Sequence, residues 1–159
     1  MADKPILVEK FNEKLDLDGK MREGGILAKV YLEVQGNDLE AAKKALENTI
    51  FNKLGAEENV NLLEVKMYDI LKEEGDHFSG VSEIHLVADD FRHFITTILR
   101  YGPSAVEITE PEEVTLNTEQ MHNIVADVSD FTHMFSQQII SMLKDPERRA
   151  LLEKVMSEK

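Results

Sequence analysis

Residues 81–111 read VSEIHLVADDFRHFITTILRYGPSAVEITEP and predict a strand, a helix and a second strand in succession. Apolar and polar side chains alternate over residues 82–88, as in a strand with one buried face. Apolar residues then recur at helical spacing from Phe91 to Leu99. Gly102 and Pro103 predict the end of this helix, and Pro111 ends a second short alternation at residues 106–109.

An earlier stretch of the chain repeats the same order. Residues 26–35 alternate as a strand, and an apolar helical stripe follows from Leu39 to Leu54, with Gly55 at the expected end. Residues 60–72 predict another strand, and the acidic, glycine-rich residues 73–80 predict a loop. Residues 26–111 therefore predict the order β-α-β-β-α-β.

This order predicts an α+β fold, the ferredoxin-like βαββαβ plait, with a four-stranded antiparallel sheet and two helices on one face. The helices are expected to cover the face that carries Val30, Leu32, Val65, Ile84 and Leu86. The opposite, open face is expected to carry Lys29, Tyr31, Glu33, Lys66, Tyr68, Glu83 and His85.

Two further segments flank the plait. Residues 1–25 predict a partly flexible lead-in, in which residues 6–8 could form a short strand and DLDGKMREGG predicts a loop. Residues 112–159 predict a helical appendage: a long helix from Thr118 to about Lys144, then a short helix that starts at Asp145-Pro146. The long helix carries a nine-residue apolar stripe: Met121, Ile124, Val125, Val128, Phe131, Phe135, Ile139, Met142 and Leu143.

Composition argues against several classes of function. The formal net charge of -13 disfavours binding to nucleic acid and to anionic membranes, both of which depend on Lys and Arg. The absence of cysteine excludes disulfides, zinc-thiolate sites and thiol nucleophiles, and fits a cytoplasmic protein. No nucleotide-binding, hydrolase or HExxH motif is present, so the sequence predicts no cofactor, no resident metal and no catalytic residue.

The segment LRYGPSAVEITEP resembles the end of the plait-like C-terminal extension domain of WYL-type transcription regulators. The matching residues are Leu99, Gly102, Val106, Glu107 and Pro111. The resemblance covers residues 99–111 closely and residues 26–111 at the level of fold. This chain lacks the winged-helix and WYL domains of that family and adds helices after the plait. The resemblance implies a domain that senses a ligand or reports to a partner.

Four residues are candidate ligand-binding residues. Tyr31 and His85 are expected on the open face, where plaits that bind RNA stack bases on aromatic side chains, although the acidic residues around them argue against RNA. Asp90 and His93 begin the second helix, where an aspartate is also explained by capping. The pairs Glu119/His122 and Asp130/His133 on the long helix are each one turn apart, but a solvated flank explains them better than a metal site.

The sequence favours a non-catalytic binding, regulatory or complex-forming protein that acts through homo-oligomerisation and a small ligand. The long apolar stripe needs a covering surface, which predicts a homodimer or a protein partner at the C-terminal helix. The alternative is a small cytoplasmic enzyme that acts on a small molecule with His and carboxylate groups, for which His85, Asp90 and His93 are the candidates.

Overall fold

A computed structural model describes residues 4–143 and 145–158 of the chain. The chain forms two compact units, residues 1–115 and residues 116–159. The strands are β1 (Leu7–Lys10), β2 (Ile26–Gly36), β3 (Val60–Met67), β4 (Leu71–Lys72), β5 (Phe78–Ala88) and β6 (Ala105–Glu110). The helices are α1 (Leu17–Arg22), α2 (Leu39–Glu47), a π-helical turn η1 (Asn48–Lys53), a 3-10 turn η2 (Leu54–Ala56), α3 (Phe91–Tyr101), α4 (Thr118–Met142) and α5 (Pro146–Ser157).

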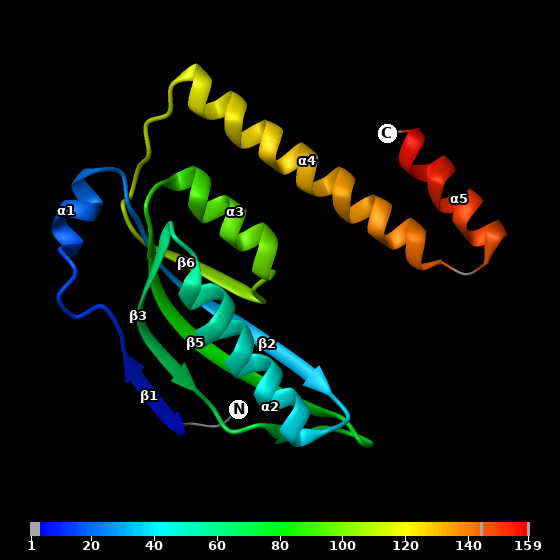
Figure 1. Ribbon diagram of the computed structural model, residues 1–159, viewed down its shortest axis with the longest axis horizontal. Helices are drawn as coiled ribbons and strands as arrows, with labels where there is room; N and C mark the ends of the chain where they lie inside the picture. Colours follow the sequence, from blue (N-terminus) through cyan, green and yellow to red (C-terminus); the bar gives the residue numbers. More distant parts are fainter. Residues whose placement is uncertain (1–3, 144, 159) are drawn as a thin grey trace. The chain divides into compact units, whose positions relative to one another are not determined.

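The first unit is built on one antiparallel sheet of six strands (Figure 1). Five strands follow the order β1-β3-β5-β2-β6, and β4 pairs with β5 off this path. All five pairings are antiparallel. The mixed α+β class is therefore confirmed, but the expected four strands are too few because β1 and β4 also join the sheet.

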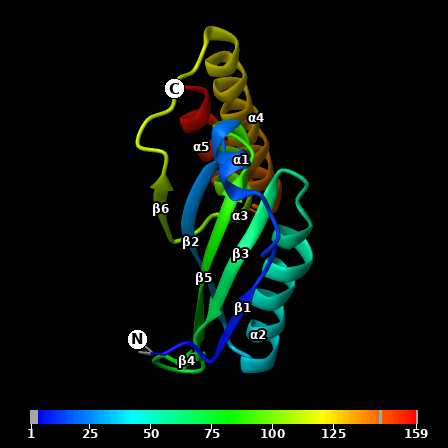
Figure 2. The ribbon, with the colours of Figure 1, turned by 90° about the vertical axis from the view of Figure 1, so that its left-hand side faces the viewer.

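The N-terminal segment supplies one of the two additional strands. Residues 7–10 pair with β3, and the amide of Phe11 donates to the carbonyl of Leu63 at 2.9 Å. The prediction of a loop at DLDGKMREGG was wrong because α1 forms there, capped by Asp16, whose side chain accepts from the amide of Gly19. Figure 2 shows β1 at the rim of the sheet; residues 1–3 lie outside the described part of the chain.

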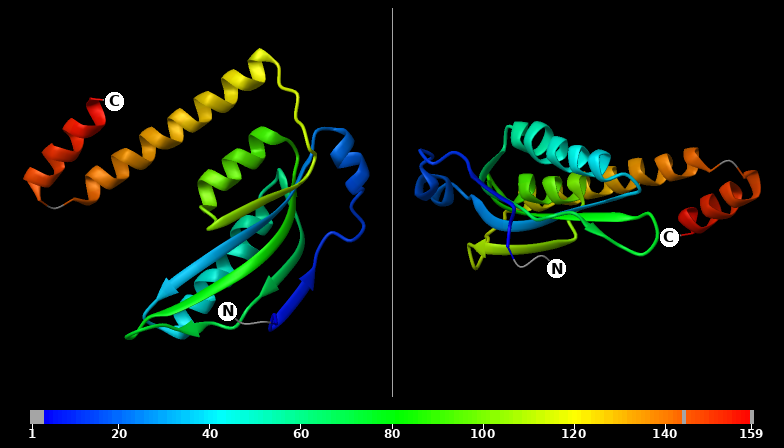
Figure 3. Two further views of the ribbon diagram at one scale, coloured as in Figure 1. Left: turned by 180° about the vertical axis from the view of Figure 1, so that it is seen from behind. Right: turned by 90° about the horizontal axis from the view of Figure 1, so that it is seen from below.

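Helices α2 and α3 lie on one side of the sheet (Figure 3, right). The five residues expected beneath them, Val30, Leu32, Val65, Ile84 and Leu86, are all buried, so this prediction is confirmed. Leu46 from α2 and Phe94 from α3 complete the same hydrophobic cluster. Burial of this apolar surface is the main stabilising contribution to the unit.

Strand β3 contains an irregularity that sequence alternation does not reveal. Its register against β5 shifts between Leu62 and Glu64, as in a β-bulge. The shift places Leu62 in the core, where it is buried, and restores Val65 to the same face. The predicted strand at residues 60–72 thus ends at Met67 and resumes as the short β4.

Both ends of α3 follow the local signals in the sequence. The side chain of Asp90 accepts from the amide of His93, and Gly102 has a φ of 54°, the left-handed conformation that glycine adopts most readily. Strand β6 follows at the edge of the sheet, and all six of its residues are exposed.

The second unit consists of α4 and α5. A capping box begins α4, in which Asn117 accepts from the amide of Gln120 and the side chain of Gln120 accepts from the amide of Asn117. Pro146 begins α5, as expected, and Asp145 caps it. Lys144, the expected end of the long helix, lies outside the described residues.

Candidate functional site

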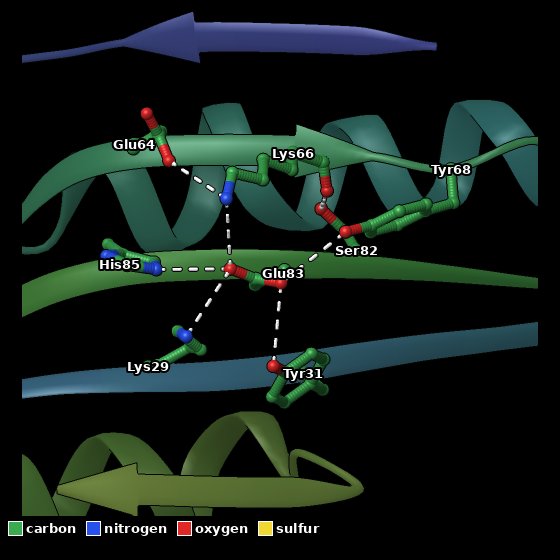
Figure 4. A network of polar contacts seen from close by, with 8 residues as sticks. All are labelled: Lys29, Tyr31, Glu64, Lys66, Tyr68, Ser82, Glu83 and His85. Atoms are coloured by element: carbon green, nitrogen blue, oxygen red, sulfur yellow. Dashed lines mark hydrogen bonds and ion pairs between the residues drawn. The ribbon is translucent and has the colours of Figure 1, made fainter. Parts of the chain in front are cut away.

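The centre of the open sheet face carries a cluster of polar side chains from three neighbouring strands (Figure 4). The register of β2 and β5 places Lys29 opposite His85 and Tyr31 opposite Glu83. The register of β3 and β5 places Lys66 opposite Glu83 as well. Cross-strand partners point to the same face, so Glu83 lies in the middle of this group.

Glu83 is nearly buried, with 8% of its surface exposed. Its Oε1 lies 3.1 Å from Nε2 of His85, 3.4 Å from Nζ of Lys66 and 3.8 Å from Nζ of Lys29. Its Oε2 lies 3.5 Å from the hydroxyl groups of both Tyr31 and Tyr68. We call Glu83 and these five neighbours the Glu83 cluster. A buried carboxylate is tolerated when donors surround it in this way.

The charges in this cluster shift one another's pKa. Burial acts to raise the pKa of Glu83, but the hydrogen bond with His85 and the charges of Lys66 and Lys29 outweigh it, so the pKa lies below its usual 4.5. The charge of Glu83 raises the pKa of Lys66. The pKa of Tyr31 is raised mainly by burial, and the charge of Glu83 is the second cause. Glu83 is therefore ionised and both Lys66 and Tyr31 are protonated at neutral pH.

The cluster has more donors than acceptors. Two ammonium groups and two phenol groups converge on one carboxylate, and each ammonium group carries three N–H donors. Glu64 accepts part of this surplus, with its Oε1 at 3.5 Å from Nζ of Lys66. Tyr31 and His85 are both partly exposed, so the outer side of the cluster can contact a small molecule through an aromatic ring and an imidazole.

The other two candidate residues make a different contact. Oδ1 of Asp90 accepts from the amide of His93 and also lies 2.8 Å from its Nδ1. This is an N-terminal cap with an attached imidazole, at the start of α3. The four candidates thus contribute to two places in the first unit: Tyr31 and His85 to the Glu83 cluster, and Asp90 and His93 to the cap.

Alternation along β5 predicts that Glu83 lies on the open face but does not predict a role for it. Alternation reveals which face a residue occupies, whereas the central position of Glu83 depends on the pairing of β5 with both β2 and β3. Strand order carries this information, and the spacing of residues along one strand does not.

Within residues 4–143 and 145–158, no group of three or more His, Cys, Asp or Glu side chains is arranged to hold a metal ion. In the same part of the chain, no helix has the length and apolar character that crossing a bilayer requires.

Comparison with known proteins identifies a family and no individual relative. No curated protein and no solved structure matches the chain. One family model matches residues 27–154, which include strand β2 from its second residue and most of α5. Because this match covers more than half of the chain, the protein belongs to the MJ0538 family.

Proposed function

We propose that the protein is a non-catalytic, complex-forming binding protein that acts as a homodimer through α4. The observation that carries this proposal is the nine-residue apolar stripe along α4, of which five residues are exposed: Met121, Val125, Val128, Phe135 and Met142. Val125, Phe135 and Met142 are 67%, 53% and 78% exposed. Large apolar side chains gathered on one surface mark an interaction site.

Helix α5 leaves this stripe free within its own unit. A groove in the second unit is lined by Ser129, Ser136 and Ile140 of α4 and by Met156 of α5. None of these three α4 residues belongs to the stripe, so α5 packs beside another flank of the helix.

The composition of α4 also suits an interface. Its charged residues are Glu119, Asp127 and Asp130 among 25 residues, whereas 31% of the whole chain is charged. Protein interfaces are depleted in charge at their centre and enriched in Met and aromatic residues. Phe131 and Phe135 stack with ring centroids 6.2 Å apart near the middle of the helix.

The spacing of the stripe favours a second copy of the chain as the occupant. Met121 and Met142, Ile124 and Ile139, and Val128 and Phe135 form pairs equidistant from a point between residues 131 and 132. If two copies of α4 lie antiparallel about a two-fold axis at this point, each residue meets the other member of its pair. A self-complementary surface of this kind is the requirement for a symmetric dimer.

This geometry predicts the effects of charged substitutions at Val128 and Phe135. Phe135→Glu places a carboxylate against Val128 of the other copy and is expected to weaken dimerisation by about 30-fold or more, the size of an interface hot spot. The double variant Val128→Lys/Phe135→Glu places opposite charges against each other and is expected to recover part of this loss. Light scattering over a range of concentrations measures the mass of each variant against the 18.1 kDa of one chain.

Ser141→Glu is the matched control because Ser141 is exposed on α4 but lies outside the stripe. It is expected to dimerise as the wild type does. A wild-type chain that stays monomeric at the highest concentration refutes the dimer. A double variant no better than Phe135→Glu refutes the antiparallel register.

We propose further that the outer side of the Glu83 cluster binds a small ligand through Tyr31 and His85. The chain has three tyrosines and no tryptophan, and two of the three tyrosines contact Glu83. Tyrosine fluorescence therefore reports directly on this face. A ligand at the cluster changes the signal, and Tyr31→Phe and His85→Ala are expected to weaken its binding; failure of both substitutions to do so excludes this face.

The alternative is a small enzyme. The 3.1 Å contact between Nε2 of His85 and Oε1 of Glu83 favours it, because a carboxylate that holds an imidazole in place is typical of a histidine that acts as a general base. Mass spectrometry of each compound that binds separates the two functions. A bound compound recovered unchanged supports the binding protein. Conversion that His85→Ala abolishes supports the enzyme.

For the fold, we infer a ferredoxin-like core with an added edge strand. The order β6-β2-β5-β3, with every pairing antiparallel, supports this inference because it is the order that two interleaved strand–helix–strand halves produce. Ligand sensing, which the resemblance to WYL-type regulators implies, and a cytoplasmic location remain predictions.

A further inference from the structure

A groove lies beside β1, at the opposite edge of the sheet from β6. Its volume is about 320 Å³, at the lower end of the roughly 300–1,000 Å³ typical of ligand sites. Buried Leu46 and Met67 contribute to its lining, together with the outer residues Ile6, Leu7 and Leu39. These three outer side chains are 58%, 42% and 40% exposed, so the groove presents an apolar surface to its surroundings.

Among residues 4–143 and 145–158, no strand pairs with the outer edge of β1, and this edge meets the groove at Leu7. In an antiparallel ladder, residues that bond to the neighbouring strand alternate with residues whose N–H and C=O groups point away. The hydrogen bond from the amide of Phe11 to the carbonyl of Leu63 implies that Glu9 and Leu7 also bond to β3. The N–H and C=O groups of Val8 and Lys10 therefore point away from β3. Outward backbone groups of this kind pair readily with an added strand.

The side chains of β1 fit an added strand on both faces. Leu7 pairs with the buried Met67 and therefore points toward the side of α2 and the groove. Val8 points to the open face and is 49% exposed. A strand added to β1 would place the side chain opposite Leu7 at the groove, and the adjacent residue would cover Val8.

Charge at the groove indicates the chemistry of such a strand. Glu40, Glu47 and Asp69 line it together with one lysine, Lys43. The excess of carboxylates favours an incoming segment that carries basic residues around its apolar core, and the net charge of -13 attracts such a segment over a longer range.

We propose that β1 and the groove bind an extended segment of a partner protein, with apolar residues at alternate positions and basic residues at its ends. Backbone hydrogen bonds to the edge strand supply affinity, and the groove supplies specificity. This site uses β1 and α2 and does not involve the stripe on α4, so it is independent of the proposed dimer.

A defined peptide tests this proposal. The probe has a Leu-Val-Leu core flanked by two lysines at each end and carries a fluorophore; an analogue has glutamates in place of the lysines. Fluorescence polarisation with the full chain is expected to show saturable binding of the basic peptide and at least about tenfold weaker binding of the acidic one.

Val8→Pro tests the strand pairing. It removes the outward N–H group of Val8 and is tolerated at an edge strand because that group does not bond to β3. It is expected to weaken binding at least about tenfold, whereas the control Val8→Ala, which keeps the N–H group, changes affinity by less than about threefold. Circular dichroism verifies that both variants fold.

Leu39→Gln tests the groove without a change of charge and is expected to weaken binding about fivefold or more. Its control is Ala45→Gln, at an exposed position of α2 that does not line the groove. Equal affinity for the basic and acidic peptides refutes the proposed chemistry, and unchanged affinity in Val8→Pro or Leu39→Gln refutes the proposed site. A change in oligomeric state in Val8→Pro indicates instead that a second copy occupies the edge, which also refutes a separate partner.

Discussion

The carboxylate of Glu83 connects side chains that are far apart in the sequence. Lys29 and Tyr31 come from β2, Lys66 from β3 and His85 from β5, and Tyr68 follows β3. The contacts from Lys29, Tyr31 and Lys66 therefore hold β2 and β3 against β5, whereas His85 contacts Glu83 within the same strand. An unpaired carboxylate here would be costly, so the cluster stabilises the fold only while its donors remain in place.

This arrangement predicts how stability depends on pH. The folded-state pKa of Glu83 lies below 4.5, so the ionised carboxylate stabilises the folded protein above about pH 4.5. That contribution is lost as the pH falls through the folded-state pKa. Glu83→Gln is expected to lower the free energy of unfolding by about 1–3 kcal/mol at pH 7, and the difference from the wild type is expected to shrink below about pH 4.5. Urea denaturation at several pH values measures both effects.

Glu33→Gln is the control for this measurement because Glu33 is exposed on the same open face. It is expected to change the free energy of unfolding by less than about 0.5 kcal/mol at each of these pH values. A constant difference between wild type and Glu83→Gln across the acid range would contradict the role assigned to the ionised carboxylate.

At the scale of elements, local chemistry made α3 predictable from the sequence. Asp90 supplies a capping oxygen and Gly102 supplies the left-handed residue, and both signals lie within one turn of the helix end that they mark. The same holds for α4, where Asn117 and Gln120 form the capping box. The face assignments of β2 and β5 also followed from alternation alone.

Other elements depend on contacts between distant residues. Strand β1 has only four residues and is held by its pairing with β3, more than fifty residues later in the chain. The bulge between Leu62 and Glu64 likewise depends on the partner strand. The convergence on Glu83 is of the same kind, which is why the sequence predicted the open face but not the residue at its centre.

The whole molecule combines a sheet unit and a helical unit, and the family match spans most of both. Residues 27–154 include β2 from its second residue, β3 to β6 and all of α4, so the match extends over both units. Strand β1 lies outside the matched residues. The proposed dimer therefore uses a matched element, whereas the proposed peptide site adds an element outside the match.

The exposed edge strand β6 is also a potential site of aggregation between copies of the molecule. Its sequence, AVEITE, is rich in residues that form strands, and Pro103 and Pro111 stand on either side of it. If two β6 edges paired antiparallel with Val106 against Ile108, Glu107 would face Glu107 of the other copy. Two like charges directly opposite each other disfavour such a pair, so Glu107 disfavours edge-to-edge association of two molecules through β6.

Removal of the charge of Glu107 is expected to make the protein aggregate faster. Glu107→Val should shorten the lag before thioflavin-positive aggregates form, and Glu107→Lys, which keeps a like-charge pair, should aggregate no faster than the wild type. Incubation of the three proteins under agitation, followed by thioflavin fluorescence and turbidity, makes the comparison. Equal lag times for Glu107→Val and the wild type would mean that another feature protects the edge. A shorter lag for Glu107→Val alone would identify the carboxylate of Glu107 as the group that prevents β6 of one molecule from pairing with β6 of another.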